Sequence, residues 1–407
     1  FITSIEIKSQ NPINDLTIMQ PQKKNITLFF DYFQSIHFEK DPFMVPYYLG
    51  KMLGYSVTII YPVFEGNKNL PSEYRGVKLI PIKVYGNWHT NLFIRYIHIY
   101  RYIRKNAKNI DIFMRFFLGP KSIWPTLIYK HYNPNGKVYI KMDINPYSLP
   151  SSNETSDNGH TNLRNRLKTK LYQAFIKHTD LISCETTEAY RRITRSSLPQ
   201  YQWGDKLIIV PNGIDEEAIK RMNLKQQSFN EKENIMITVG RLGTEQKNNE
   251  MLLRALEQTN LKDWKIYLIG SIEPEAKPLF DHYLQIHPEW TNKVIFTGPI
   301  YDRRLLYNYF NKSKVFILTS RLEGYAIVFA EAKRFSNYIV STPVGAVYDI
   351  IENEKYGKTI PQEDDKALAT TLQDIINGKT DINVYDGFDV ESLSWEQIVS
   401  IIKSKLQ

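Results

Sequence analysis

Residues 315–332, VFILTSRLEGYAIVFAEA, carry the pattern that decides the fold class. Their first four residues are apolar and predict a buried strand, and the stretch after Gly324 predicts a helix. A strand followed by a turn and a helix is the repeating unit of a doubly wound α/β domain, in which ligands bind at the carboxyl ends of the strands. Glu323 would lie in the turn, and Glu331 would follow roughly 10 Å further along the helix at 1.5 Å per residue.

Two carboxylates at this spacing have two interpretations. In the first, Glu323 and Glu331 hold separated hydroxyl groups of one extended ligand, while free backbone N–H groups at residues 326–328 face its phosphates. In the second, Glu331 is a surface residue and Glu323 is a charge that favours the helix dipole. The stretch alone leaves both open.

Similar units occur on both sides of this stretch. Apolar β-branched runs that alternate with helical stretches predict parallel sheets covered on both faces. Helices are expected over 43–53 and 92–105. The expected strands of a first series are 26–30, 56–60, 77–80, 110–114, 137–141, 180–183 and 206–210, and those of a second series are 235–239, 265–269, 294–296, 315–318 and 338–340.

The polar segment 224–234 separates the two series and is typical of a linker. We therefore expect an α/β protein of two doubly wound, Rossmann-like domains, 1–222 and 223–393. A last helix, within 394–407, would carry an apolar face and begin at Ser394 as its N-cap. That face is expected to contain Trp395, Ile398, Ile401 and Ile402.

Composition and charge limit the classes of partner. Hydrophobic residues make up 42% and charged residues 23% of the 407, which is typical of a globular protein. Residues 1–222 carry 30 basic and 18 acidic side chains, whereas residues 223–407 carry 22 and 25. A positive first half admits nucleic acid, an anionic membrane surface or a phosphorylated small molecule. We find no nucleic-acid-binding module and expect no nucleic-acid partner.

The stretch 93–108 is rich in Arg, Lys and Tyr and also has two interpretations. It is an ordinary helix with one buried stripe, or a surface that meets anionic lipid. The polar segment 151–162 has no apolar residue and is expected to form a loop. A single cysteine, Cys184, favours a reducing compartment. No apolar run predicts a membrane span or signal peptide, so we expect a cytoplasmic protein, peripheral on the membrane at most.

Two further segments have the composition of binding turns. Residues 239–249, VGRLGTEQKNN, join a strand to a helix, and Arg241 and Lys247 would give this turn a site for an anion such as diphosphate. A solvated surface loop has the same composition. Residues 210–215, VPNGID, follow a strand, and their Asn-Gly pair predicts a tight turn.

Taken in this order, VPNGID (210–215), VGRLGTEQK (239–247) and EGYAIVFAEA (323–332) resemble the retaining glycosyltransferases of the GT-B fold, specifically glycosyltransferase family 4. The resemblance runs from about residue 180 to the C-terminus. It implies two domains that face each other across a cleft, with a C-terminal helix that returns to the first domain. It also implies transfer of a sugar from a nucleoside diphosphate sugar to a glycan or lipid-linked acceptor.

The resemblance further implies the residue roles. Arg241 and Lys247 would bind the donor diphosphate, Glu323 would contact sugar hydroxyls, and Glu331 would hold the ribose. Backbone at Gly324, Tyr325, Ala326 and Ile327 would face the sugar and phosphates, and backbone near Gly298 and Ile300 would seat the nucleobase. Fixed cations and a helix end then stabilise the leaving group, so we expect neither a metal nor another cofactor.

Three positions depart from the family pattern. No glycine pair follows the first strand, Asn248 stands where a glycine is usual, and Ala326 replaces the second glycine of E-G-F-G. The first departure leaves a non-catalytic GT-B binding protein as the alternative function. Asp143, at the end of a predicted strand, and His37, after the first one, are the first-domain candidates for catalytic contacts, because strand ends face the cleft.

Overall fold

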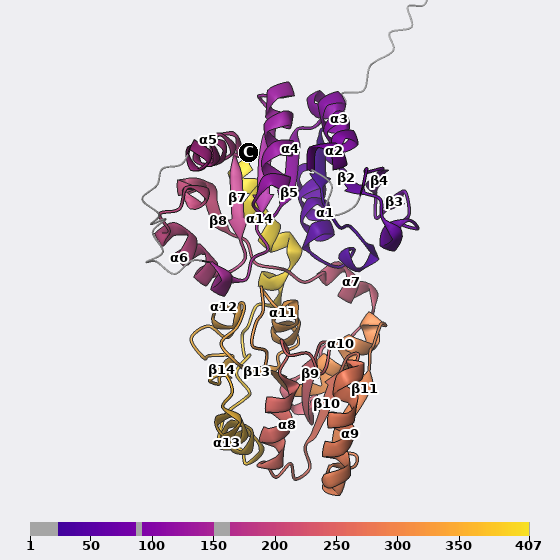
Figure 1. Cartoon of the computed structure of the whole chain (residues 1–407). Coiled ribbons are helices and arrows are strands. Elements are labelled where there is room, and N and C mark those ends of the chain that lie inside the picture. Colours follow the sequence, from indigo (N-terminus) through magenta and orange to yellow (C-terminus); the bar gives the residue numbers. More distant parts are fainter. Residues whose placement is uncertain (1–22, 87–91, 150–162, 407) are drawn as a thin grey trace, which may run out of the picture.

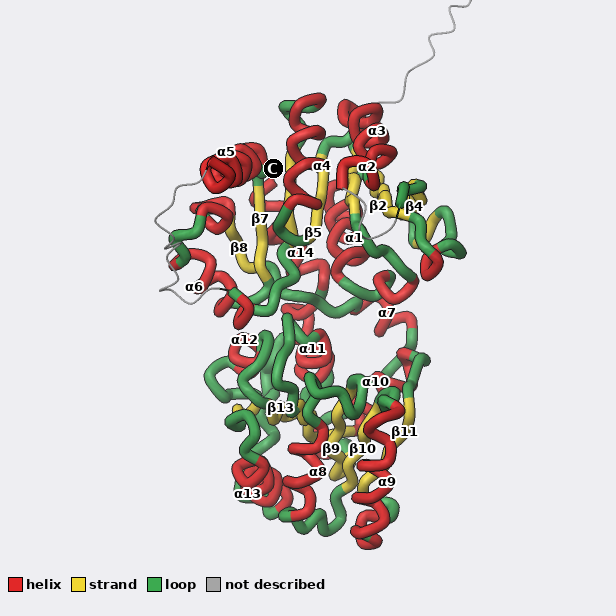
Figure 2. The backbone as a smooth tube through the Cα atoms, viewed as in Figure 1, coloured by secondary structure: helices red, strands yellow, loops and turns green. Residues whose placement is uncertain are grey.

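The computed structural model of the chain describes residues 23–86, 92–149 and 163–406. Figure 1 shows two bodies joined by a narrow waist, each built on one sheet with helices packed around it. The same alternation of strands and helices is visible along the tube in Figure 2. The expected loop 151–162 lies outside the described residues.

The described part of the first domain contains an eight-stranded sheet in the order β3-β4-β2-β1-β5-β6-β7-β8. Neighbouring strands are parallel except β3 and β4, which are antiparallel. The strands are β1 (Asn25–Phe29), β2 (Ser56–Pro62), β3 (Glu73–Tyr74), β4 (Val77–Ile82), β5 (Ile112–Phe116), β6 (Lys137–Lys141), β7 (Leu181–Cys184) and β8 (Leu207–Ile209).

The described part of the second domain contains a six-stranded sheet in the order β11-β10-β9-β12-β13-β14, and all its pairings are parallel. The sequence predicted five of these strands and missed the short β14. The strands are β9 (Glu233–Val239), β10 (Lys265–Ile269), β11 (Val294–Gly298), β12 (Ser313–Leu318), β13 (Tyr338–Ser341) and β14 (Gly357–Thr359).

Both sheets are buried on both faces. In β5, Met114 packs into one apolar cluster and Phe113 into another on the opposite side. In β9, Met236 and Ile237 divide in the same way between two clusters of the second domain. Because successive side chains of a strand point to opposite faces, this division requires helices on both sides of each sheet.

The helices that cover the sheets follow the strands in sequence. The expected helix 92–105 is divided in two, with Tyr96 between its parts. The helices are α1 (Asp41–Leu53), α2 (Leu92–Arg95), α3 (Ile97–Asn106), α4 (Pro120–Tyr132), α5 (Leu163–His178), α6 (Thr187–Arg195), α7 (Glu216–Arg221), α8 (Asn249–Glu257), α9 (Lys277–Ile286), α10 (Arg303–Lys312), α11 (Ile327–Arg334), α12 (Val347–Ile351), α13 (Asp365–Ile376) and α14 (Trp395–Leu406).

The last helix, α14, returns to the first domain as expected. Trp395, Ile398 and Ile402 are buried in an apolar cluster of that domain, and Ser394 Oγ caps the helix by accepting from the N–H of Gln397 at 3.2 Å. The expectation for Ile401 is wrong, because its side chain is 40% exposed. Ile398 and Ile402 are four residues apart and share one face of the helix. Ile401 directly precedes Ile402, so its side chain lies at the edge of that face.

A second helix, α7, adjoins the first domain and packs against the second. Ile219 of α7, which follows the first sheet, packs into a core cluster of the second domain. Arg334 of α11 donates to Glu216 of α7 at 2.9 Å. Ile214 pairs with Ser394 in an isolated bridge, so the two crossings of the chain lie side by side. Each domain therefore packs against a helix that adjoins the other.

Candidate functional site

Lys247 and Glu323 meet at the carboxyl ends of β9 and β12. Lys247 Nζ lies 2.6 Å from Glu323 Oε1, and Ser320 Oγ donates to the same oxygen at 2.6 Å. Both charged side chains are largely buried. The structure thus brings two predicted site residues, 76 positions apart, into one ion pair. A cation held in this way can attract a diphosphate, while the other carboxylate oxygen stays available for a hydroxyl group.

Arg241 lies in the same β9 turn but makes few contacts. Its side chain is 64% exposed and its Nη1 is 4.0 Å from Glu273. Among the described residues, no hydrogen bond or ion pair joins Arg241 to the Lys247–Glu323 pair. A long exposed side chain of this kind is free to reorient onto an anionic ligand.

The backbone at two departures from the family pattern explains why glycine is usual there. Asn248 has φ of 44° and Ala326 has φ of 63°, both in the left-handed region. Asparagine tolerates this region better than most residues, whereas alanine is strained in it. Each residue directly precedes a helix, α8 or α11, so the turn shape is retained without glycine.

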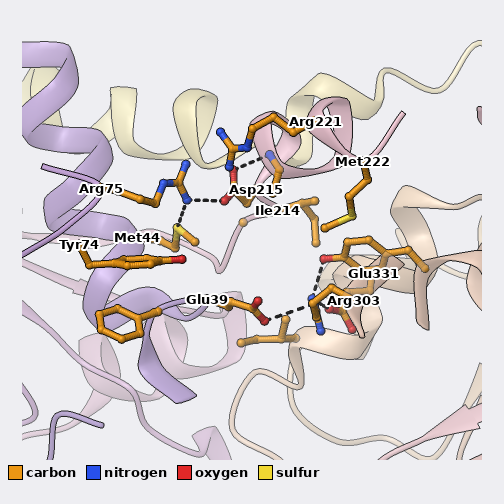
Figure 3. A pocket seen from close by; sticks show the side chains of 15 residues that line it. Glu39, Met44, Tyr74, Arg75, Ile214, Asp215, Arg221, Met222, Arg303 and Glu331 are labelled. Carbon is orange, nitrogen blue, oxygen red and sulfur yellow. Dashed lines mark hydrogen bonds and ion pairs between the residues drawn. The ribbon is translucent and has the colours of Figure 1, made fainter. Parts of the chain in front are cut away.

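Glu331 lies on α11 and is almost fully buried beside an interdomain cavity. Arg303 Nη2 donates to Glu331 Oε1 and, at 2.6 Å, to the hydroxyl of Tyr307. Arg303 Nε also lies 3.3 Å from Glu39 Oε2 of the first domain. Figure 3 shows Arg303 between the two carboxylates, with Asp215 and Arg75 on the other side of the space. Ile327 and Glu331 both line this cavity of about 80 Å³.

The expected nucleobase seat lies at the end of β11. Gly298 adopts φ of 73°, and its carbonyl accepts from the N–H of Gly270 at 3.0 Å. Ile300 follows and packs against the second-domain core. The positive φ at Gly298 turns the chain sharply between β11 and α10, which places this backbone at the same sheet edge as Arg303.

Asp143 is exposed at the carboxyl end of β6 and faces the second domain. A Cβ built on Gly324 would lie 3.4 Å from Asp143 Oδ1, so the E-G-Y turn and Asp143 are direct neighbours across the cleft. Although solvent reaches Asp143, protein atoms crowd its carboxyl group. This desolvation, followed by the charge on Asp41, raises the pKa of Asp143.

A buried charge cluster lies beneath Asp143. Lys141 is fully buried on β6, and its Nζ contacts Glu185, Asp41 at 3.0 Å and Asn212 Oδ1 at 3.1 Å. Burial disfavours the charge on Lys141, but the carboxylates of Asp41 and Glu185 outweigh it and raise the pKa of Lys141. Burial raises the pKa of Glu185 against the effect of Lys141. The turn residue Asn212 therefore anchors the VPNGID segment to the cleft floor.

The buried cluster also reaches the second domain. Tyr325 is 5% exposed, and burial followed by the Glu185 carboxylate raises the pKa of its hydroxyl. Thr187 donates its N–H to Asp349 Oδ2 at 2.8 Å, another direct hydrogen bond between the domains. The two domains therefore meet beside Tyr325 and Gly324.

His37 has mainly local contacts. Its Nδ1 accepts from the N–H of Gln34 at 2.9 Å, and its ring lies 5.1 Å from that of Phe30. Burial, and then the charge on Lys40, lower the pKa of His37, which keeps the imidazole neutral at pH 7. These contacts fix the loop after β1, where the family pattern has its glycine pair.

Sequence reasoning missed Arg303, Glu39, Asp41 and Glu185 as parts of the site. Two of them left a signal in the sequence. Arg303 opens a helix, where a cation opposes the helix dipole, and Glu185 follows the apolar strand β7 directly. A charge placed against a local preference indicates a partner elsewhere in the fold.

Among the described residues, no group of three or more His, Cys, Asp and Glu side chains is placed to hold a metal ion. Within the same residues, no helix combines the length and apolar character needed to cross a bilayer.

Comparison with known proteins shows which family the residues of this cleft resemble. Residues 220–385, which contain Lys247, Glu323 and Glu331, match the family model of the glycosyl transferases group 1. The match covers 166 of the 407 residues, so the second domain is similar to the group 1 glycosyl transferases. The chain has the GT-B fold expected from its three segments, with two Rossmann-like domains and a C-terminal helix on the first.

Similar proteins come from several sources. The amylovoran biosynthesis glycosyltransferase AmsD of Erwinia amylovora is 30% identical over 115 residues, 28% of this chain and 31% of AmsD. The O-antigen chain mannosyltransferase C of Escherichia coli is 24% identical over 226 residues, 53% of this chain and 57% of that protein. The chain thus spans less than two thirds of the length of either relative.

A solved structure has the same fold over most of the chain. Anabaena HepE in complex with UDP is 13% identical, with a TM-score of 0.63, and the match covers 94% of this chain and 99% of HepE. At this identity the likeness establishes the arrangement of the two domains and nothing about residue roles. The structural match therefore includes the first domain, which lies outside the residues that match the family model.

Proposed function

We propose that the chain transfers a sugar from a nucleoside diphosphate sugar to a glycan or lipid-linked acceptor. The observation that carries this proposal is the buried Lys247–Glu323 pair at 2.6 Å, placed at the strand ends of the second domain. A cation and a carboxylate at this position suit the two ends of a sugar diphosphate, with Lys247 at the phosphates and Glu323 at the sugar hydroxyls.

The remaining roles follow from the same placement. Arg241 swings onto the diphosphate, and the first N–H groups of α11, at Ile327 and Val328, add the positive end of a helix. Glu331 gives up part of its hydrogen bonding with Arg303 and accepts hydrogen bonds from the ribose hydroxyls instead. Backbone at Gly298 and Ile300 borders the nucleobase. HepE was solved with UDP, which supports a uridine nucleotide as the first donor to test.

The transfer is proposed to retain the anomeric configuration and to need no metal. The acceptor hydroxyl oxygen bonds to the anomeric carbon, the bond from that carbon to the diphosphate oxygen breaks with its electron pair, and the hydroxyl proton leaves with the nucleoside diphosphate. Lys247, Arg241 and the α11 N-terminus balance the charge of the leaving group. Asp143, beside Gly324, binds an acceptor or sugar hydroxyl. Neighbours named for amylovoran and O-antigen chains support a glycan as product.

Donor binding tests the proposal. In a panel of UDP-, GDP- and dTDP-sugars, the sugars of one nucleotide should raise the melting temperature of the chain. A ligand that binds only the native state stabilises that state. Lys247→Ala should weaken that binding by ~1.5–3 kcal/mol, roughly 10- to 150-fold in Kd, which is the range for a hydrogen bond to a charged group. Isothermal titration measures both proteins.

Lys277→Ala is the matched control, because Lys277 lies in the same domain with an exposed side chain paired to Asp281. It should bind the donor as the native chain does. Equal Kd values for Lys247→Ala and the native chain would contradict the assigned role. Donor binding without hydrolysis or transfer would instead favour the alternative, a non-catalytic GT-B protein.

We also propose that the first domain meets an anionic membrane surface, where a lipid-linked acceptor would lie. On α3, Arg101, Arg104 and Lys105 are exposed, and Figure 1 shows this helix at the end of the domain away from the second one. On α5, Leu163 is 70% and Leu167 is 60% exposed. Cations with exposed apolar side chains are typical of surfaces that bind anionic lipid.

Flotation with liposomes tests this surface. The chain should float with vesicles that contain phosphatidylglycerol at low salt, and the bound fraction should fall as salt screens the charges. Arg101→Glu/Arg104→Glu should float less, whereas Lys277→Glu/Lys379→Glu, on the second domain, should float as the native chain does. No flotation at low salt would overturn the proposal.

A further inference from the structure

A second cavity of the first domain opens beside Asp143. Its volume is about 300 Å³, within the range of small-molecule sites, and it lies at the carboxyl ends of β5 and β6. The aromatic side chains of Phe117, Tyr172 and Tyr201 line it, together with Met142. Asp143 lies both on this cavity and next to Gly324 of the second domain. The cavity therefore adjoins the position proposed for the donor sugar.

Phe117 is held in an unusual conformation at this cavity. Its φ is 64°, a region that bulky side chains rarely adopt, and its ring is 37% exposed. Three contacts impose the turn: the N–H of Phe117 donates to the Lys141 carbonyl at 3.0 Å, Ser122 Oγ donates to the Phe117 carbonyl at 2.7 Å, and the Phe30 ring lies 6.0 Å away. Strain that the surroundings impose is typical of ligand sites, and here it occurs at an aromatic residue that lines the cavity.

The polar groups of the cavity are few and carry no positive charge. Among its described lining residues, Asp143 and the side chain of Gln200 can bind hydroxyl groups, and no Lys or Arg is present. Burial, and then the neighbouring Tyr172, raise the pKa of Tyr201, so both phenols stay protonated and can donate. The charge cluster behind Asp143 contains two further carboxylates, Asp41 and Glu185, and both are already paired with the buried Lys141. A phosphate in this cavity would have no cation to bind and a carboxylate beside it.

We infer that this cavity binds the acceptor as an uncharged sugar, whose C–H face stacks on Phe117 and whose hydroxyl groups bind Asp143 and Gln200. The inference rests on the proposed function and names the substrate class of its acceptor side. Aromatic rings offer a large apolar face with a polar rim, which suits a sugar ring that is apolar on its faces and polar at its edge. The hydroxyl group that attacks the anomeric carbon is then one on the acceptor sugar that points toward Gly324.

The positive charge of the first half lies elsewhere. Arg101, Arg104 and Lys105 lie on α3 and line a separate shallow groove with Tyr132. Any phosphate of a lipid-linked acceptor would therefore bind away from the reacting sugar. The terminal sugar that receives the new linkage is the neutral part of the acceptor.

Binding of defined glycosides to the full chain tests the inference. A panel of p-nitrophenyl hexopyranosides and the matching hexose 6-phosphates would be titrated and observed by saturation-transfer NMR, with and without a nucleoside diphosphate. Phe117→Gly removes the ring and suits the positive φ, so the variant should fold. We expect at least one glycoside to bind tenfold or more tightly than its 6-phosphate, and Phe117→Gly to weaken it at least tenfold. Tyr85→Ala, an exposed aromatic position of the same domain, should not change binding.

The donor side is measured separately in the same proteins. Phe117→Gly should keep the native Kd for the nucleotide, because Phe117 lies outside the Lys247–Glu323 site. A glycoside that binds Phe117→Gly as tightly as the native chain, a preference for the 6-phosphate, or no glycoside binding at all would overturn the inference. If the native chain binds no nucleotide, that result would instead contradict the proposed function.

Discussion

Glu323→Ala should abolish most of the sugar transfer while leaving the chain folded. The change removes the carboxylate proposed to bind the sugar hydroxyls, and it frees Lys247, which Glu323 holds at 2.6 Å. Hydrogen bonds to charged groups contribute about 1.5–3 kcal/mol each and 1.36 kcal/mol is tenfold in rate, so losing two lowers kcat/KM roughly 10²- to 10⁴-fold. Steady-state transfer assays measure the loss, and thermal unfolding checks the fold.

Asp281→Ala is the matched control for this variant. Asp281 lies in the same domain and accepts a hydrogen bond from Lys277 at 2.6 Å, so it loses an ion pair of similar geometry. Its exposed position outside the Lys247–Glu323 pair leads us to expect native kcat/KM within about twofold, as for a surface ion pair of roughly 0–1 kcal/mol. Equal activity of Glu323→Ala and Asp281→Ala would remove the carboxylate from the mechanism.

Lys141→Met should lower the free energy of unfolding more than any other single change considered for this chain. Lys141 is the cation of a buried cluster that holds Asp41 and Glu185. Removing one partner from a buried ion pair leaves uncompensated charge and costs about 3–5 kcal/mol. Lys137→Met, on the same strand but 49% exposed and 3.8 Å from Asp180, should cost at most about 1 kcal/mol. Urea unfolding compares the two.

The deficit of Lys141→Met should depend on pH. The pKa of Glu185 is raised in the folded chain, so folding takes up a proton, and this contribution is full at acid pH and lost as the pH rises through that pKa. Without Lys141 the buried carboxylates are more costly still when ionised. The difference in stability between the native chain and Lys141→Met should therefore grow from pH 5 to pH 8. A difference that shrinks over this interval would contradict the role given to Lys141.

Local pattern predicted the strands and helices because each follows from residues that are neighbours in sequence. The runs 137–141 and 265–269 form strands with the expected bounds, since apolar β-branched residues buried on both faces have few alternatives. The two-residue β3 and the three-residue β14 carry no such run, and their pairing depends on the strand beside them.

The residues proposed for the donor could be predicted for the same reason, because Lys247, Glu323 and Glu331 lie in compact motifs. Glu39 and Arg303 are 264 positions apart and meet only when the two domains face each other. Such a pair leaves almost no trace in either segment. The same holds for the cavity beside Asp143, whose rings come from three separate segments.

The reciprocal helix exchange limits how this molecule can be cut. A break in the linker near residue 225 would leave one piece holding α7, whose Ile219 belongs to the core of the other piece, and a second piece holding α14, whose Trp395 belongs to the core of the first. Neither piece is complete alone, and each displays an apolar face that the other covers. The two pieces should therefore reassociate when mixed, and either one expressed alone should aggregate.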